Sequence, residues 1–140
     1  MQYDVSVGEY DGLGLKGIVE SGAWFVGIKN WKPENDVQNI DTLERHLLTD
    51  EVFILLAGQC ALLLVNNNDI TSPTYTVTMM EPYKVYCIPK GAWHNTITWP
   101  GVKLALMENR NTCADNSEFF AITPAMRADI AAILSSHREG

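Results

Sequence analysis

Short apolar runs recur along this chain at regular intervals, and turn-forming residues such as glycine, proline and asparagine separate them. The runs cover residues 51–56, 60–65, 74–80, 85–88, 94–99 and 102–108, and an earlier pair flanks Ser21-Gly22. Several of them are rich in β-branched and aromatic side chains, which favour strands. Short strands at this spacing predict an all-β sandwich or barrel. Ala57-Gly58-Gln59, between two such runs, is predicted to be a hairpin turn.

The last part of the chain has a different period. Thr123-Pro124 combines a good N-cap with proline at the first helical position. The apolar residues Met126, Ile130 and Leu134 then follow at helical spacing. We therefore expect one amphipathic helix over about residues 124–137, with its apolar face on the outside of a sheet.

Composition limits the class of protein. The chain has 140 residues, of which 46% are hydrophobic, and no linker or repeat divides it, so a single domain over residues 1–140 is expected. No apolar run is long enough to cross a bilayer, and the first residues do not resemble a secretory signal, which favours the cytoplasm and no membrane partner. A net charge of −7 with scattered basic residues argues against a nucleic-acid partner.

The cysteines give little indication of a functional role. There are three of them, without the spacing of a metal site. Cys60 and Cys87 lie in apolar runs and are predicted to be buried, whereas Cys113 lies in a polar loop.

Two stretches carry most of the polar groups suited to chemistry. In an extended segment Glu44 and His46 project to the same face, because side chains alternate along a strand. Glu51 follows the turn at Thr49-Asp50, which can bring it beside His46. A turn at Pro89-Lys-Gly91 places His94 at the start of a later strand. We expect the two stretches to meet in space.

These stretches resemble the two motifs of the cupin superfamily. The first motif has the pattern His-x-His, three or four residues, Glu, six residues, Gly, and His46, Glu51 and Gly58 match it. The second has the pattern Gly, five residues, Pro-x-Gly, two residues, His, and residues 89–94 match its end. The resemblance spans about residues 44–98. It implies a double-stranded β-helix, the jelly-roll-like barrel of cupins, here with a C-terminal α-helix.

The sequence departs from the family pattern at three positions. Glu44 stands in place of the first histidine, Tyr83 in place of the glycine that opens the second motif, and Thr98 in place of its closing asparagine. The resemblance implies that the metal ligands are Glu44, His46, Glu51 and His94. One nitrogen ligand has thus become a carboxylate.

Two imidazoles with one or two carboxylates form a competent set of ligands for Fe(II), Mn(II), Zn(II) or Ni(II). No organic cofactor is expected. The alternative is that Glu44 is a surface residue paired with Arg45, that both histidines are structural, and that Glu51 is salt-bridged. Phe53 and Leu55 share the face of Glu51 and are predicted to line an apolar pocket. Trp93, beside an inward His94, is expected in the core or in a subunit contact.

Three functions are compatible with these residues. The first is a metal-dependent enzyme acting on a small polar metabolite in the barrel, with Glu44 as a ligand or a general base; no further catalytic residue is predicted. The second is a metal-free small-molecule-binding or sensory protein. The third is an assembly role, since cupins are commonly dimers, and a homodimer is expected.

Overall fold

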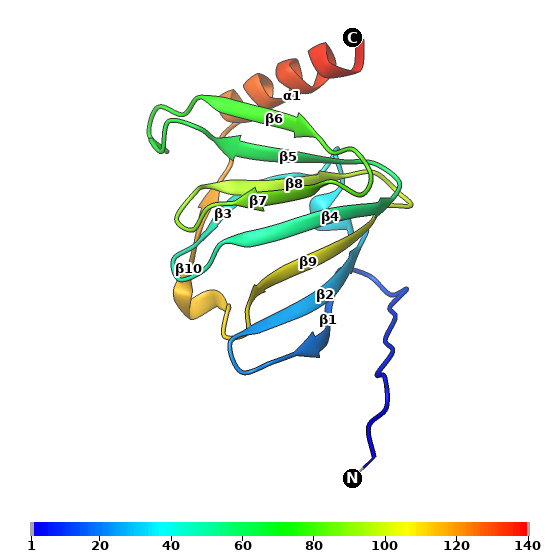
Figure 1. Ribbon diagram of the computed structural model, residues 1–140. Coiled ribbons are helices and arrows are strands. Elements are labelled where there is room, and N and C mark those ends of the chain that lie inside the picture. Colours follow the sequence, from blue (N-terminus) through cyan, green and yellow to red (C-terminus); the bar gives the residue numbers. More distant parts are fainter. Residues whose placement is uncertain (1, 140) are drawn as a thin grey trace.

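Ten strands and one α-helix make up most of the part of the chain that the structure, a computed structural model, describes: residues 2–139 (Figure 1). The first sheet contains β1 (Leu15–Glu20), β2 (Trp24–Asn30), β9 (Lys103–Asn109), β4 (Glu51–Ala57) and β7 (Val85–Ile88), in this spatial order. The second contains β10 (Ser117–Ala121), β3 (Thr42–His46), β8 (His94–Thr98), β5 (Cys60–Val65) and β6 (Tyr75–Met79). Two short 3₁₀ helices, η1 (Pro33–Asn35) and η2 (Ala114–Asn116), and α1 (Pro124–Glu139) complete the elements. The all-β class and the C-terminal helix are therefore confirmed.

The turn at Ala57-Gly58-Gln59 does not close a hairpin, contrary to the prediction. β4 pairs with β7 and β9, whereas β5 pairs with β6 and β8 in the other sheet. The chain thus crosses from one sheet to the other at this turn. Gly58 has a φ of 73°, and a Cβ at this position would lie 2.7 Å from the carbonyl oxygen of Gly101. Close packing against the turn that follows β8 requires glycine here.

The interior between the sheets is filled by side chains that alternate along the strands. The first sheet contributes Phe53, Leu55, Leu104 and Leu106, and the second contributes Cys60 and Leu62. All six are at most 5% exposed. Because this apolar cluster occupies the middle of the interior, polar groups that share the inward face collect beyond it, toward the strand ends.

A second apolar layer lies on the outside of the second sheet, where α1 covers it. Met126, Ile130 and Leu134 are buried there together with residues of β3, β5 and β8. Burial of a side chain of this size contributes about 1.5–3 kcal/mol. The backbone N–H of Met126 donates to Oγ1 of Thr123, as expected for the predicted N-cap.

Trp93 belongs to this outer layer, as predicted, and is 5% exposed. The guanidinium of Arg45 lies 4.6 Å from the centre of its ring, and Phe120 meets it edge-on. Trp93 therefore packs away from the interior that its neighbour His94 faces.

The first residues lie outside both sheets. The segment before β1 extends away from the body of the molecule in Figure 1, and Tyr3, Val5 and Val7 are more than 80% exposed. Its end is held by Asn30, whose Nδ2 donates to the carbonyls of Tyr10 and Gly12. Between residues 2 and 139 no helix combines the length and the hydropathy that crossing a membrane requires.

The predicted burial of the cysteines is correct for Cys60 and wrong for Cys87. Cys60 is fully buried between the sheets. β7 is an edge strand whose Tyr86 and Ile88 are the more buried residues, so the intervening Cys87 points outward and is exposed. Cys113 is exposed, as expected for a loop.

Candidate metal centre

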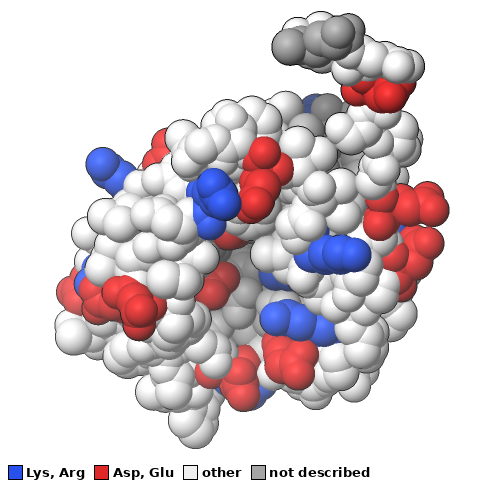
Figure 2. All heavy atoms as spheres, turned by 90° about the horizontal axis from the view of Figure 1, so that it is seen from below, with Lys and Arg blue, Asp and Glu red and all other residues white. Residues whose placement is uncertain are grey.

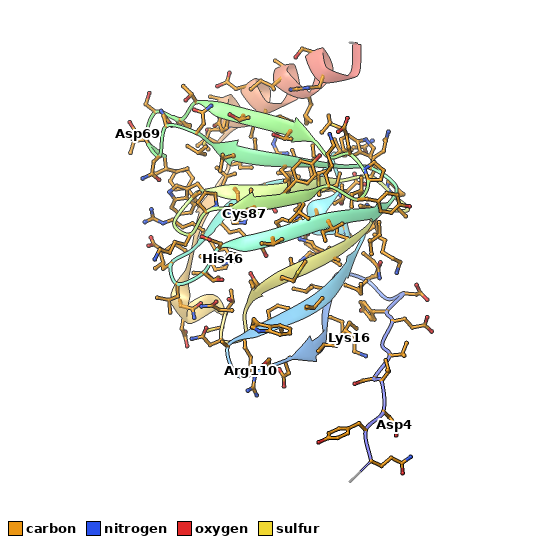
Figure 3. The ribbon with its side chains drawn as sticks, in the orientation of Figure 1. Asp4, Lys16, His46, Asp69, Cys87 and Arg110 are labelled. Carbon is orange, nitrogen blue, oxygen red and sulfur yellow. The ribbon has the colours of Figure 1, made fainter. Side chains whose placement is uncertain are left out.

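The two histidine-bearing stretches meet where β3, β4 and β8 end or begin on one side of the interior. β3 carries Glu44 and His46, β4 begins with Glu51, and β8 begins with His94. Glu44 and His94 are direct partners in the antiparallel pairing of β3 with β8. Figure 3 shows His46 at the end of β3, where the chain turns into β4.

Hydrogen bonds donated by two backbone amides hold the two stretches together. The N–H of Gly91, in the turn before His94, donates to the carbonyl of His46 over 2.7 Å. The N–H of Lys90 donates to Oδ1 of Asp50 over 2.8 Å. The position of His94 relative to His46 and Glu51 is therefore fixed by the main chain, not by side chains alone.

Glu44, His46, Glu51 and His94 converge, and each offers one ligand atom within 4.8 Å of the others. Oε1 of Glu51 lies 2.9 Å from Nε2 of His94 and 3.5 Å from Nε2 of His46. Oε1 of Glu44 lies 3.9 Å from both of these nitrogens. The structure thus brings together all four residues that the sequence indicated as ligands.

Both histidines direct Nε2 toward the cluster because Nδ1 is engaged elsewhere. Nδ1 of His94 donates to the carbonyl of Ala92 over 2.9 Å, since a carbonyl can only accept. Nδ1 of His46 shares a hydrogen bond of 2.9 Å with Oγ of Ser117 on β10. Histidine ligands of metals commonly donate the other ring N–H in this way, which leaves the lone pair of Nε2 for the ion.

Glu108 is a fifth polar group at the cluster, and the sequence reasoning missed it. It lies on β9, is 9% exposed, and has Oε2 at 3.8 Å from Nε2 of His46. Its position was accessible from alternation, because Leu104 and Leu106 on the same strand face inward. Neither motif includes Glu108, so the alternation of inward and outward residues along β9 is the sequence feature that indicates its inward position.

The carboxylates and imidazoles perturb one another strongly. Burial, the largest influence, lowers the pKa of His46, but three neighbouring carboxylates outweigh it and the pKa is raised. Burial would raise the pKa of Glu51, yet interaction with the two histidines holds it well below its usual range. Burial and the charge of Glu51 raise the pKa of Glu108 to about 8. A cluster with this excess of carboxylates favours a bound cation.

The donor set fits a divalent metal ion. Metal–ligand bonds of about 2.0–2.2 Å place neighbouring ligand atoms about 3–4 Å apart, which matches the separations of 2.9–3.9 Å in the cluster. Among the described residues, Nε2 of His46 and Oε2 of Glu108 are buried without a hydrogen-bond partner. Buried polar atoms of this kind are costly unless a ligand or ion satisfies them. These residues can bind a metal ion, and the donor set does not select one metal.

Glu44 marks the open side of the cluster. Its side chain is 29% exposed, compared with 10% for His46, 6% for Glu51 and 2% for His94. It also lines a cavity of about 200 Å³ with residues from β2, η1, β8 and β10. Seen from below, the molecule has a hollow with acidic and basic side chains around it (Figure 2).

Phe53 and Leu55 occupy the inward face of β4 together with Glu51, as expected from alternation. Both are 1% exposed and pack in the apolar cluster between the sheets. Their predicted role as pocket lining stays a prediction.

Comparison with solved structures identifies the fold. A cupin-2 domain protein from Shewanella frigidimarina aligns with a TM-score of 0.53 and 19% identity, over 72% of this chain and 85% of that one. The cupin domain of Cnp3 from Schizosaccharomyces pombe aligns with a TM-score of 0.51 and 15% identity, over 74% of this chain and 69% of that one. This chain has the cupin fold. PAC13 of Streptomyces, solved with uridine, aligns with a TM-score of 0.56 and 9% identity, over 86% of this chain and 92% of that one. No family model and no curated protein matches the sequence.

The departures from the cupin motifs have local structural counterparts. Tyr83, where cupins have glycine, has a φ of 70°, its N–H donates to the carbonyl of Leu55, and its side chain is 77% exposed. The backbone therefore keeps a left-handed conformation without the residue that favours it. Thr98 is fully buried, and its hydroxyl donates to the carbonyl of Asn35.

Proposed function

We propose that this protein is a metal-dependent cupin enzyme that acts on a small polar metabolite. The observation that carries the proposal is the convergence of four ligand atoms within 4.8 Å, with both histidine Nε2 atoms directed at the same point. A fold can be maintained without such an arrangement, and burying the carboxyl groups of Glu51 and Glu108 beside two imidazoles is costly without a cation.

His46, His94 and Glu51 would hold the ion, because they are the most buried of the four converging ligand residues. A divalent ion at this position supplies Lewis acidity, which polarises a substrate oxygen or activates water. Glu44, on the open side, contacts an incoming metabolite as a ligand or as a base. Ser117 and the carbonyl of Ala92 keep both imidazoles oriented.

Metal reconstitution tests the proposal. Purified protein is stripped with chelator, incubated with Fe(II), Mn(II), Zn(II) or Ni(II), desalted, and analysed for metal content and thermal unfolding. We expect about one ion per chain and a higher Tm with at least one metal. His46→Ala and His94→Ala should lose the ion, whereas the exposed His137→Ala control should retain it. Absence of stoichiometric metal and of any rise in Tm with all four ions would contradict the proposal.

The alternative is a metal-free binding or sensory module, and the carboxylate at Glu44 in place of a histidine favours it. In that case small polar ligands would raise the Tm of the stripped protein, and added metal would not change the shift. Uridine, present in the PAC13 structure, is a suitable neutral ligand for this comparison.

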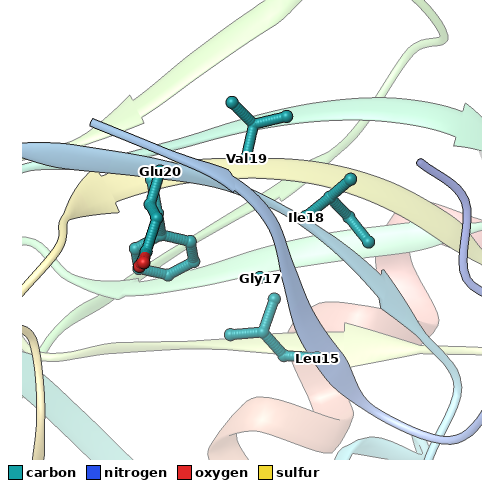
Figure 4. A pocket seen from close by; sticks show the side chains of 6 residues that line it. Leu15, Gly17, Ile18, Val19 and Glu20 are labelled. Carbon is teal, nitrogen blue, oxygen red and sulfur yellow. The ribbon is translucent and has the colours of Figure 1, made fainter. Parts of the chain in front are cut away.

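We also propose a homodimer that forms through β1. This strand is at the edge of its sheet, and Leu15, Val19 and Trp24 around it are 42–48% exposed. A hollow of about 500 Å³ lies beside it, lined by Leu15, Gly17, Ile18, Val19, Glu20 and Phe25 (Figure 4). Exposed apolar edge strands tend to pair with other chains. Analytical ultracentrifugation should give twice the chain mass for the parent and the chain mass for Val19→Lys; a monomeric parent would contradict the proposal.

A further inference from the structure

Lys29 is a buried cation that the proposed metal site does not use. It lies on β2 and is 9% exposed, and its Nζ donates to Oγ1 of Thr96 over 2.9 Å. Among the side chains of residues 2–137, which the structure describes, no carboxylate lies within 4.0 Å of this nitrogen. An ammonium group has three donors, of which one is used here. Burial of a charge without a partner is costly, so an anion is the group that would compensate it.

The position of Lys29 connects it to the metal cluster. Thr96 follows His94 by two residues on β8 and therefore projects to the same inward face, about 6–7 Å away along the strand. Lys29 and Glu44 line the same cavity of about 200 Å³. The cavity therefore connects the ammonium of Lys29 with Glu44, the exposed member of the ligand cluster.

Asn35 adds an unused acceptor to the wall of this cavity. Its Nδ2 donates to Oδ1 of Asn95 over 3.0 Å and to the carbonyl of Thr96 over 3.2 Å, which fixes the orientation of the amide. Its Oδ1 is buried without a partner among the described residues. The cavity thus offers spare donors on Lys29, which a carboxylate would engage, and a spare acceptor on Asn35, which a hydroxyl or N–H group of the same molecule would engage.

We propose that Lys29 determines substrate specificity and that the substrate is a small monocarboxylate or dicarboxylate with one carboxylate held by the Lys29 ammonium. This rests on the proposed function, because the other end of the molecule meets the metal cluster. One buried ammonium matches the single charge of a carboxylate. The cavity is also lined by Lys32 and by three acidic residues, Glu34, Asp41 and Glu44. Acidic side chains thus outnumber basic ones, so a phosphate dianion, which concentrates two charges in one group, fits less well than a carboxylate.

The test measures ligand binding to metal-loaded protein by calorimetry. The probes are glycolate and malonate, with malonamide and uridine as neutral comparators and inorganic phosphate as the other anion. The variants are Lys29→Met, which keeps the volume, and Lys29→Gln, which keeps a donor for Thr96 but removes the charge. Lys16→Met, exposed on β1, is the matched control. Metal content and Tm are recorded on every sample.

We expect the parent and the Lys16→Met control to bind at least one carboxylate at least tenfold more tightly than the neutral probes. Both Lys29 variants should lose about tenfold to a hundredfold in affinity, since a hydrogen bond to a charged group is worth about 1.5–3 kcal/mol. Unchanged carboxylate affinity in a folded Lys29 variant, no carboxylate binding by the parent, or preferred binding of phosphate would overturn the proposal.

The two proposals fail separately. If the parent takes up no metal but the stripped protein binds malonate in a Lys29-dependent way, the anion site stands and the metal-dependent function is wrong. If the parent binds metal and no carboxylate, the anion site is wrong and the metal site stands.

Discussion

Replacing Glu108 by glutamine should stabilise the metal-free protein, by an amount that depends on pH. The pKa of Glu108 rises from 4.5 to about 8 on folding, because the carboxyl is buried beside Glu51. Between these values the folded protein holds a proton that the unfolded chain releases, so stability falls as pH rises. The contribution of the Glu108 carboxyl group to the free energy of unfolding is therefore fully present below pH 4.5 and is lost above pH 8. Glutamine has nearly the same shape and cannot ionise.

The size of the effect follows from the two pKa values. One pKa unit corresponds to about 1.4 kcal/mol. The free energy of unfolding of Glu108→Gln should therefore exceed that of the parent by about 3 kcal/mol at pH 7 and by about 5 kcal/mol above pH 8. Below pH 4.5 the variant and the parent should be equally stable. A bound divalent cation favours the ionised carboxyl, so metal should reduce the difference.

Urea denaturation of stripped protein at several pH values between 4.5 and 8.5 measures this difference. Glu9→Gln, in the exposed N-terminal segment, is the control and should show no pH-dependent gain. The reasoning is that carboxylates of the cluster repel one another when no cation is bound. It would be refuted if, at pH 8 without metal, the free energies of unfolding of Glu108→Gln and the parent differed by less than about 1 kcal/mol.

Three further predictions concern single residues. Ser117→Ala removes the hydrogen-bond partner of Nδ1 of His46, and metal affinity, measured by competition with a chelating dye, should fall about tenfold to a hundredfold. Gly58→Ala should cost about 2–5 kcal/mol in denaturant unfolding, because left-handed strain adds to contacts at 2.7 Å, whereas Gly91→Ala, with open space at its Cβ, should cost only about 1–2 kcal/mol. Tyr83→Gly should stabilise by about 1 kcal/mol by relieving a φ of 70°, measured as a rise in Tm. An unchanged dye competition, equal costs for the two alanine variants, or a fall in the Tm of Tyr83→Gly would each argue against the corresponding step.

Local patterns in the sequence were sufficient for the strands and for most of the ligand cluster. Alternation predicts that Glu44 and His46 share a face, and the turn that follows can bring Glu51 beside His46. These arguments depend on neighbours within a few residues. That His94 joins them was implied by the resemblance to the two cupin motifs, not by local pattern.

Pairing between distant strands was not accessible in the same way. Turn chemistry at Gly58 indicates that the chain reverses, but it does not distinguish a hairpin from a crossing between sheets. The apolar run around Cys87 gives no sign that its strand lies at an edge. Glu108 and Lys29 each occupy one inward position on a strand without a motif, and their meaning depends on which residues lie across the interior.

The hydrogen bond from the Gly91 amide to the carbonyl of His46 has a consequence for dynamics. Opening of the 89–93 turn would break this bond and move His94 away from the remaining donors in one event. Release of an ion and local unfolding of this turn would then be the same motion, so ligation should suppress amide exchange at Gly91 by the factor by which it stabilises the closed form. A single backbone proton would thus report how long the site stays assembled.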